Sequence, residues 1–294
     1  MNYLKLILSM LIFGTIGIVV AYIPLPSVMI VGFRSLLGAL IVGLMLIFRR
    51  SAINKASVKK NFIWLLLSGV ALAANWILLF ESYDHTGSIA ISTLCYYMAP
   101  VFVTILSPIF LKERLSAMRV ICTAVAVVGA ALISGASTSE PLVLTGILMA
   151  LGAALLYALI VIFNKKMTRM PTQETTFFQL IIATVVALPY ALMMHGGSIT
   201  FSKNWVIPML ILGVVHTGVA YLLFFGAANK LPAQSTAVLS YIDPVTAVLL
   251  STLLPQSLLG TPQQQLDTYE IVGCVMILCA AFFGEVFGAR KKRR

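Results

Sequence analysis

Charged residues are scarce in this chain. Only 10% of its 294 residues are Asp, Glu, Lys or Arg, whereas 60% are hydrophobic, and the mean hydropathy is +1.02. A water-soluble domain could not bury so much apolar surface, so we expect lipid to surround most of the chain. Cysteine is also rare, and no spacing typical of a metal site or a disulfide framework occurs. We expect small buried hydrophobic side chains at the four cysteines, Cys95, Cys122, Cys274 and Cys279.

Catalytic signatures are missing as well. The sequence contains no HExxH, GxSxG or Walker motif, and no pair of carboxylates falls in one plausible site. We therefore predict that the protein is not an enzyme and uses neither a cofactor nor a bound metal. No nucleotide-binding domain is present in the chain, which argues against ATP-driven transport by this chain alone.

Long apolar runs dominate instead, and each is long enough, or nearly so, to cross a bilayer as a helix. They are continuous and do not alternate, which disfavours membrane-spanning strands. The sequence therefore predicts an all-α integral membrane protein with ten transmembrane helices, near residues 3–23, 26–48, 61–81, 87–111, 117–134, 142–163, 173–194, 205–228, 232–254 and 269–288.

The basic residues follow a simple pattern along these segments. The net charge is +11, and eighteen of the twenty Lys and Arg residues fall in connections on one side; Lys203 and Arg34 are the exceptions. Positive loops stay in the cytoplasm during insertion, so we expect both termini to be cytoplasmic. This distribution excludes a nucleic-acid partner. The basic tail at 290–294 could bind anionic lipid, but its role as a topology anchor is favoured.

Two stretches 144 residues apart repeat one pattern. Residues 88–115 and 232–259 each place Tyr-x-x-Pro in the middle of an apolar segment, at Tyr97 to Pro100 and Tyr241 to Pro244. The repeat divides the chain into two halves, 1–136 and 137–294. Each half has five segments, an odd number, so the second half enters the membrane from the opposite side. Residues 261–267 are an insertion in the last outer loop.

Several short motifs follow one another in a fixed order along the chain. They are Pro26, Arg34, Asn75, Trp76, Phe80, Tyr97, Pro100, the run Leu111 to Leu115, Tyr221, Tyr241, Asp243 and Pro244. In these motifs the chain resembles the drug/metabolite transporter superfamily, in its ten-helix EamA branch, over nearly its whole length. This resemblance implies a secondary transporter that exports amino acids or related compounds. The family usually repeats a glutamate after the second proline helix, where this chain has Ser257.

Only two charges, Asp243 and Arg34, clearly lie at membrane depth in the predicted helices. Asp243 lies near the middle of its segment, directly before Pro244, whose ring should open the helix and free the carbonyl of Ser240. A carboxylate beside an opened turn suits a proton or an amine, although a structural charge or a capped kink is the alternative. For Arg34, a role in organising the outer part of the fold is favoured over one in binding.

The remaining candidates are polar, aromatic or conformational. Aromatic rings with polar tips can line a pocket for a zwitterion or a planar ring, but each could equally serve helix packing. His216 could titrate, yet a lone histidine on a membrane helix more often packs. Candidates for substrate or ion binding are Asn75, Trp76, Tyr97, Tyr157, His216, Tyr221, Ser240, Tyr241 and Asp243; Gly14, Arg34, Pro100 and Pro244 are structural or gating candidates.

Together these features favour a secondary transporter of the bacterial inner membrane that works by alternating access. Its partners would be a small-molecule substrate, the bilayer and, through Asp243, protons; the oligomeric state stays open. A multidrug exporter of lipophilic cations is the first alternative. A non-transporting structural membrane protein is another, and a membrane-embedded enzyme is disfavoured because no convergent catalytic groups occur.

Overall fold

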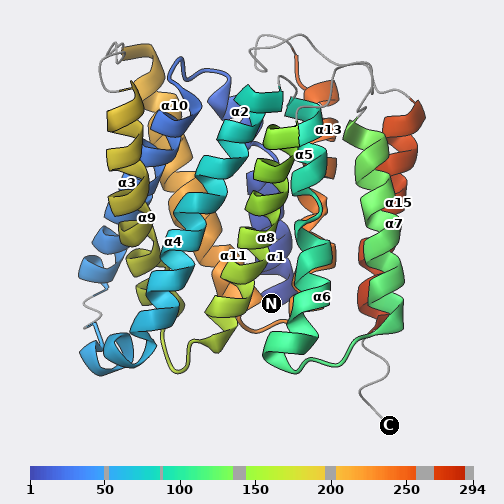
Figure 1. Ribbon diagram of the computed structural model, residues 1–294, viewed down its shortest axis with the longest axis horizontal. Helices are drawn as coiled ribbons and strands as arrows, with labels where there is room; N and C mark the ends of the chain where they lie inside the picture. Colours follow the sequence, from blue (N-terminus) through green and yellow to red (C-terminus); the bar gives the residue numbers. More distant parts are fainter. Residues whose placement is uncertain (50–52, 87–88, 135–143, 196–202, 256–267, 289–294) are drawn as a thin grey trace.

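The structure is a computed structural model, which describes residues 1–49, 53–86, 89–134, 144–195, 203–255 and 268–288. Every regular element in these ranges is helical, as expected (Figure 1). The insertion predicted at 261–267, Ser257 and the basic tail at 290–294 lie outside the described residues. The helices stand roughly side by side in a bundle that is long enough to cross a bilayer.

The first half of the chain forms seven elements. The helix α4 (Lys55–Thr86) begins six residues before the predicted segment 61–81, because polar contacts hold its start: the Asn61 amide donates to the Thr168 carbonyl at 3.0 Å and accepts from the Thr168 N–H at 2.9 Å. The elements are α1 (Asn2–Phe13), α2 (Ile16–Val20), α3 (Ser27–Phe48), α4 (Lys55–Thr86), α5 (Ile89–Tyr96), α6 (Ala99–Leu111) and α7 (Ala117–Ser134).

The second half contains one feature that the sequence did not predict. Between α10 (Val206–Ile211) and α11 (Ala220–Ala228) the chain forms a π-helix, η3 (Leu212–Val219), a form that is rare and is often found at functional sites. The elements are α8 (Leu144–Lys166), α9 (Thr172–His195), η2 (Lys203–Trp205), α10 (Val206–Ile211), η3 (Leu212–Val219), α11 (Ala220–Ala228), α12 (Ala233–Ser240), α13 (Ile242–Leu253) and α15 (Thr268–Gly288).

Seven stretches in the described residues are long and apolar enough to span a membrane. Two more predicted segments, 117–134 and 269–288, contain the shorter apolar helices Ala117–Leu132 and Ile271–Gly284. The last, 232–254, is divided into α12 and α13. The protein is therefore a multi-pass membrane protein. The seven stretches are Asn2–Val20, Ser27–Phe48, Lys55–Thr86, Ser92–Leu111, Leu144–Lys166, Thr172–Met194 and Val206–Ala228.

The two repeated motifs interrupt their helices, as predicted. Pro100 is the second residue of α6, which follows α5 after a break at Tyr97 and Met98. Pro244 is the third residue of α13, which follows α12 after a break at Tyr241. Proline suits the first turn of a helix because its missing N–H would have no partner there.

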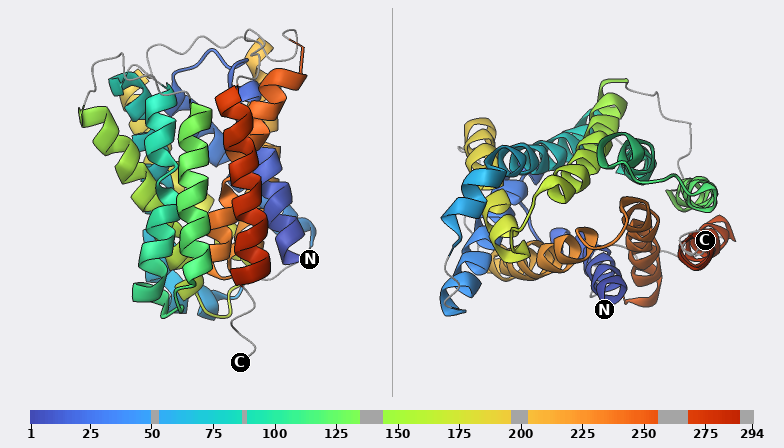
Figure 2. Two further views of the ribbon diagram at one scale, coloured as in Figure 1. Left: turned by 90° about the vertical axis from the view of Figure 1, so that its right-hand side faces the viewer. Right: turned by 90° about the horizontal axis from the view of Figure 1, so that it is seen from below.

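Neighbouring helices mostly come from different halves. The pairs α4 with α8, α3 with α9, α1 with α11 and α7 with α15 pack closely, and the last pair forms one edge of the bundle (Figures 1 and 2). Small residues allow this approach: Ala150, Ala154 and Ala158 on α8 are fully buried. A Cβ at Gly146 would lie only 2.5 Å from the Thr86 side chain, so this ridge of α8 faces α4.

The cysteines follow the expectation only in part. All four are free thiols, and Cys122 and Cys274 are buried among the packed helices. Cys95 is half-buried and Cys279 is exposed, which corrects the prediction of four buried side chains. The exposure of Cys279 has a simple reason: α15 lies at the edge of the bundle, where its outer face has no protein neighbour (Figure 2).

Candidate functional site

The two repeated tyrosines meet at the centre of the molecule. The Tyr241 hydroxyl donates a 2.7 Å hydrogen bond to the Tyr97 carbonyl, and the ring centroids lie 6.4 Å apart. The bond satisfies a backbone carbonyl at the interruption between α5 and α6, where the regular helical hydrogen bonds stop. Since the two residues are 144 positions apart, the spacing of the repeat, equivalent points of the two halves are in direct contact.

Asp243 lies next to this contact, in the first turn of α13. The carboxylate is half-buried, and among the described residues it makes no side-chain hydrogen bond or ion pair. Its position at a helix N-terminus suits a negative charge. Helices of both halves surround it with hydroxyls within electrostatic range, and we call these residues the tyrosine cluster: Tyr83, Tyr96, Tyr97, Tyr157 and Tyr221.

The Ser240 side chain contacts the tyrosine cluster near Asp243. Its hydroxyl donates to the Thr236 carbonyl at 2.8 Å, so it accepts from the Tyr157 hydroxyl at 3.1 Å. The Tyr157 ring packs edge-on against Tyr96, with centroids 6.2 Å apart. The structure thus brings Ser240 and Tyr157 to Asp243. The sequence predicts that Pro244 frees the Ser240 carbonyl for binding, whereas the contacts in the structure are made by the Ser240 hydroxyl.

Arg34 is the second charge within the bundle, and it is buried, with only 3% of its surface exposed. Its Nε donates to Thr217 Oγ1 at 3.0 Å, and its guanidinium lies 4.7 Å from the centroid of the Trp76 ring. The Trp76 Nε1–H in turn donates to the Tyr221 hydroxyl at 3.1 Å. Among the described residues Arg34 has no ion-pair partner, and no hydrogen bond reaches its two terminal nitrogens.

The position of Arg34 depends on the π-helix. Because η3 is wider than an α-helix, the Thr217 hydroxyl donates to the carbonyl five residues back, Leu212, at 3.0 Å, and its oxygen is left to accept from Arg34. No local sequence pattern predicts this geometry.

The two charges within the bundle, Arg34 and Asp243, have neighbours in common without forming an ion pair. Tyr96 and Tyr221 lie within electrostatic range of both Arg34 and Asp243. A buried charge without a partner is costly and usually marks a place where a ligand or water compensates it. The site therefore presents a cation and an anion with aromatic hydroxyls near both.

His216 is held away from the carboxylate. Its Nε2 lies 2.7 Å from Thr15 Oγ1, and its Nδ1 lies 3.3 Å from the Ile211 carbonyl. Both ring nitrogens therefore have partners, and one of them tethers η3 to the interruption between α1 and α2. No hydrogen bond joins His216 to Asp243 among the described residues.

Asn75 and Gly14 hold helices close together around the site. The Asn75 amide donates to the Ala153 carbonyl at 2.6 Å and so joins α4 to α8. Gly14 lies at the interruption after α1, where a Cβ would be 2.5 Å from Thr246 Cβ and 2.9 Å from the Asp243 carbonyl oxygen. Only glycine allows α1 to approach α13 this closely.

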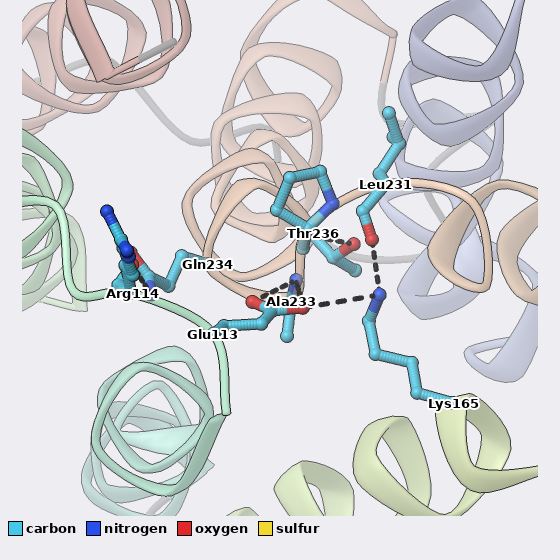
Figure 3. Close-up of polar contacts among 8 residues, drawn as sticks. Glu113, Arg114, Lys165, Leu231, Ala233, Gln234 and Thr236 are labelled. Carbon is cyan, nitrogen blue, oxygen red and sulfur yellow. Dashed lines mark hydrogen bonds and ion pairs between the residues drawn. The ribbon is translucent and has the colours of Figure 1, made fainter. Parts of the chain in front are cut away.

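On the side of the bundle where α6 and α8 end, a polar network joins the two halves (Figure 3). The Glu113 carboxylate accepts from the Ala233 N–H, at 3.1 and 3.0 Å, and forms an ion pair with Lys165 at 3.6 Å. The Lys165 ammonium also donates to the Leu231 carbonyl. Gln234 adds a third link, because its amide donates to the Arg114 carbonyl at 3.1 Å. We call this set the latch.

Sequence reasoning missed part of this site. Glu113 belongs to the run Leu111 to Leu115 that carries the family resemblance, and its partner Lys165 is one of the basic loop residues, so neither stands out as a site residue. Tyr83 and Tyr96 were not singled out, although both are polar aromatic residues in or beside apolar segments, and that signal could have found them. No sequence signal connects Glu113 with Lys165, because they lie 52 positions apart in different halves.

Comparison with known proteins agrees with these observations. The sequence pattern of the EamA-like transporter family matches residues 1–135 and again 144–284. An uncharacterized transporter of Bacillus subtilis, YxxF, is 30% identical over 279 residues, which are 93% of this chain and 86% of that protein. Another from the same organism, YoaV, is 24% identical over 91% of this chain and 90% of its own length.

A solved crystal structure supports the same architecture. It covers 100% of this chain and 99% of its own chain with a TM-score of 0.82 at 17% sequence identity, so it shares the fold. The repeated family match, the membrane-spanning helices and the similarity to named transporters together show that the chain belongs to the EamA-like transporter family.

Proposed function

We propose that this transporter exports amino acids or related zwitterionic metabolites across the bacterial inner membrane by alternating access. Its ten helices would form two inverted halves, 1–136 and 137–294, with both termini in the cytoplasm. The contact between Tyr97 and Tyr241 supports an axis between the halves. The start of α1 and the end of α15 lie at the same end of the bundle, as an even number of crossings requires (Figure 2).

One observation carries the choice of substrate: Arg34 is buried and Asp243 half-buried, and the two share aromatic neighbours but do not pair with each other. An amino acid has both complementary charges. Its carboxylate would bind the terminal nitrogens of Arg34, whose planar fork suits bidentate contact. Its ammonium group would bind Asp243 among the rings of the tyrosine cluster.

The latch supports a conformational cycle. With the latch closed, Glu113 and Lys165 hold α6, α8 and the start of α12 together at the end that carries the basic loops. This end would be cytoplasmic by the positive-inside rule, so substrate would be released outward from the latched state. Opening the latch would admit the next substrate from the cytoplasm. The interruptions at Pro100 and Pro244 would let the helices bend during this motion.

Asp243 would also couple export to protons. A carboxylate can hold either a proton or an ammonium group, so binding of one disfavours the other. A proton that enters from outside would displace the substrate and return with the carrier to the cytoplasmic side. Export of the metabolite would then be driven by proton entry.

A second candidate is an exporter of lipophilic cations. It is favoured by the aromatic rings around Asp243, since such rings attract organic cations. The two candidates differ at Arg34. A zwitterion needs the guanidinium, whereas a cation gains nothing from it and is repelled by its charge.

Transport into proteoliposomes tests these proposals. Radiolabelled leucine, its decarboxylated amine and tetraphenylphosphonium would be compared with and without a pH gradient, in the wild type and in Asp243→Asn and Arg34→Gln. The matched control is Asp84→Asn, which removes the charge of an exposed carboxylate in the last turn of α4. We expect gradient-driven leucine flux that Asp243→Asn uncouples.

Arg34→Gln should lower the preference for leucine over the amine at least about tenfold, the loss of a hydrogen bond between charged groups. Leucine flux that responds to neither substitution would contradict the proposed site. Flux of tetraphenylphosphonium alone, unchanged in Arg34→Gln, would establish the cation exporter instead.

A further inference from the structure

A cavity of about 440 Å³ opens near the helix ends on the latch side, between α1, α3, α9 and α11. Its size falls in the range of ligand sites. Three cations line it: Lys5 from the first turns of α1, Arg49 directly after α3, and Lys230 just after α11. We propose that this cavity binds the phosphate group of an anionic phospholipid of the cytoplasmic leaflet.

The charge of the cavity favours an anion. Among the described residues no aspartate or glutamate lines it, and none of the three cations forms an ion pair there. The nearest acid in sequence, Glu174 in the first turn of α9, is buried and does not line the cavity. Three like charges around one space repel each other, and a phosphate placed between them relieves that repulsion.

The cavity is separate from the transport site. Tyr221, which faces the centre, and Phe224 beside it share one face of α11. Leu222, Leu223 and Gly226 line the cavity from the opposite face, because successive residues of a helix are rotated by about 100°. The body of α11 therefore lies between the two sites.

The depth of the cavity favours a lipid over a soluble phosphate. Its lining runs along the chain from Lys230 to Val219, a rise of about 16 Å at 1.5 Å per residue. The mouth is basic, but the inner wall is apolar, with Met45 from α3 and Leu222 and Leu223 from α11. A phospholipid would place its phosphate at the mouth and part of an acyl chain along the wall. Basic pockets between helices on the cytoplasmic side bind anionic headgroups in this way.

Native mass spectrometry of the purified full chain tests the proposal, with phosphatidylglycerol compared with phosphatidylcholine of the same acyl chains. The first variant combines Lys5→Ala, Arg49→Ala and Lys230→Ala. Its control combines Lys55→Ala, Lys59→Ala and Lys60→Ala, which removes the same charge from exposed positions at the start of α4. We expect the first variant to bind phosphatidylglycerol roughly a hundredfold more weakly, since each of the three cations near the surface contributes about a factor of five. The control should bind like the wild type.

A second variant fills the cavity without changing its charge. A Cβ at Gly226 meets only Thr172, at 3.6 Å, so Gly226→Leu should fold while its side chain occupies the space. Loss of phosphatidylglycerol binding in this variant supports the site. Two results would overturn it: a loss of phosphatidylglycerol binding that is equal in the triple cavity variant and in its triple control, or full binding in Gly226→Leu. Glycerol 3-phosphate that binds the wild type as tightly as the lipid does would assign the cavity to a soluble phosphate ester and overturn the lipid assignment.

Discussion

Replacing Glu113 with alanine should open the latch. The Glu113 carboxylate accepts from the Ala233 N–H at the start of α12, a capping contact worth about 1 kcal/mol. Its ion pair with Lys165 contributes about another 0.5–1 kcal/mol, because both side chains are only partly exposed, at 22% and 11%. The loss of about 2 kcal/mol shifts the ratio of closed to open molecules about 30-fold toward the open state.

The assay is a distance distribution from spin labels placed at Leu115→Cys and Lys230→Cys, one in each half on the latch side. The native thiols would first be replaced with alanine at Cys95, Cys122, Cys274 and Cys279. A glutamine at 113 keeps a neutral acceptor for the Ala233 N–H and loses the ion pair. Glu113→Gln should therefore shift the ratio only about fivefold, which corresponds to about 1 kcal/mol.

The control is Lys112→Gln, a change of charge at the exposed neighbouring residue, which should leave the distances unchanged. A graded response, with alanine larger than glutamine and glutamine larger than the control, is the expected result. Identical distributions in the wild type and Glu113→Ala would refute the reasoning, because the network would then not hold the two halves together.

Two further predictions concern the centre of the bundle. Tyr241→Phe removes the donor to the Tyr97 carbonyl and should lower the free energy of unfolding by about 1–3 kcal/mol, measured by thermal unfolding in detergent. Tyr97→Phe keeps the carbonyl and should lower the free energy of unfolding clearly less. Equal losses of stability in the two variants would contradict this account. Gly14→Ala places a methyl group 2.5 Å from Thr246 Cβ and should reduce transport severely. In Gly17→Ala the new methyl group meets nothing within 4 Å, so this variant should transport like the wild type. Normal flux in Gly14→Ala would show that the close approach of α1 to α13 is not needed for transport.

Much of the fold could be predicted from the sequence, because hydropathy and proline act locally. The apolar segments become helices wherever they are continuous, and the helices break beside Pro100 and Pro244, where the ring prevents a regular turn. The ends of α4 were predicted less well. Its start extends six residues beyond the expected segment, since a polar contact between Asn61 and Thr168 stabilises it.

The candidate site could be predicted only in part. Asp243 and Arg34 stand out because charges are rare in apolar segments. The sequence could not show that Arg34 lies over Trp76 or that its Nε bonds to Thr217, because that position depends on the π-helix and on how α3 packs against it. His216 stood out for its chemistry, yet its partners are Thr15 and a backbone carbonyl.

The sequence by itself therefore determined the membrane environment, the helices, their interruptions and the two charges within apolar segments, all of which depend on residues close together along the chain. Only the tertiary structure decided which groups meet across the two halves: Tyr241 with the Tyr97 carbonyl, and Glu113 with Lys165. These contacts depend on the relative depth and rotation of helices that are distant in sequence. Packing of small residues along entire helix faces sets both quantities, and no local pattern encodes them.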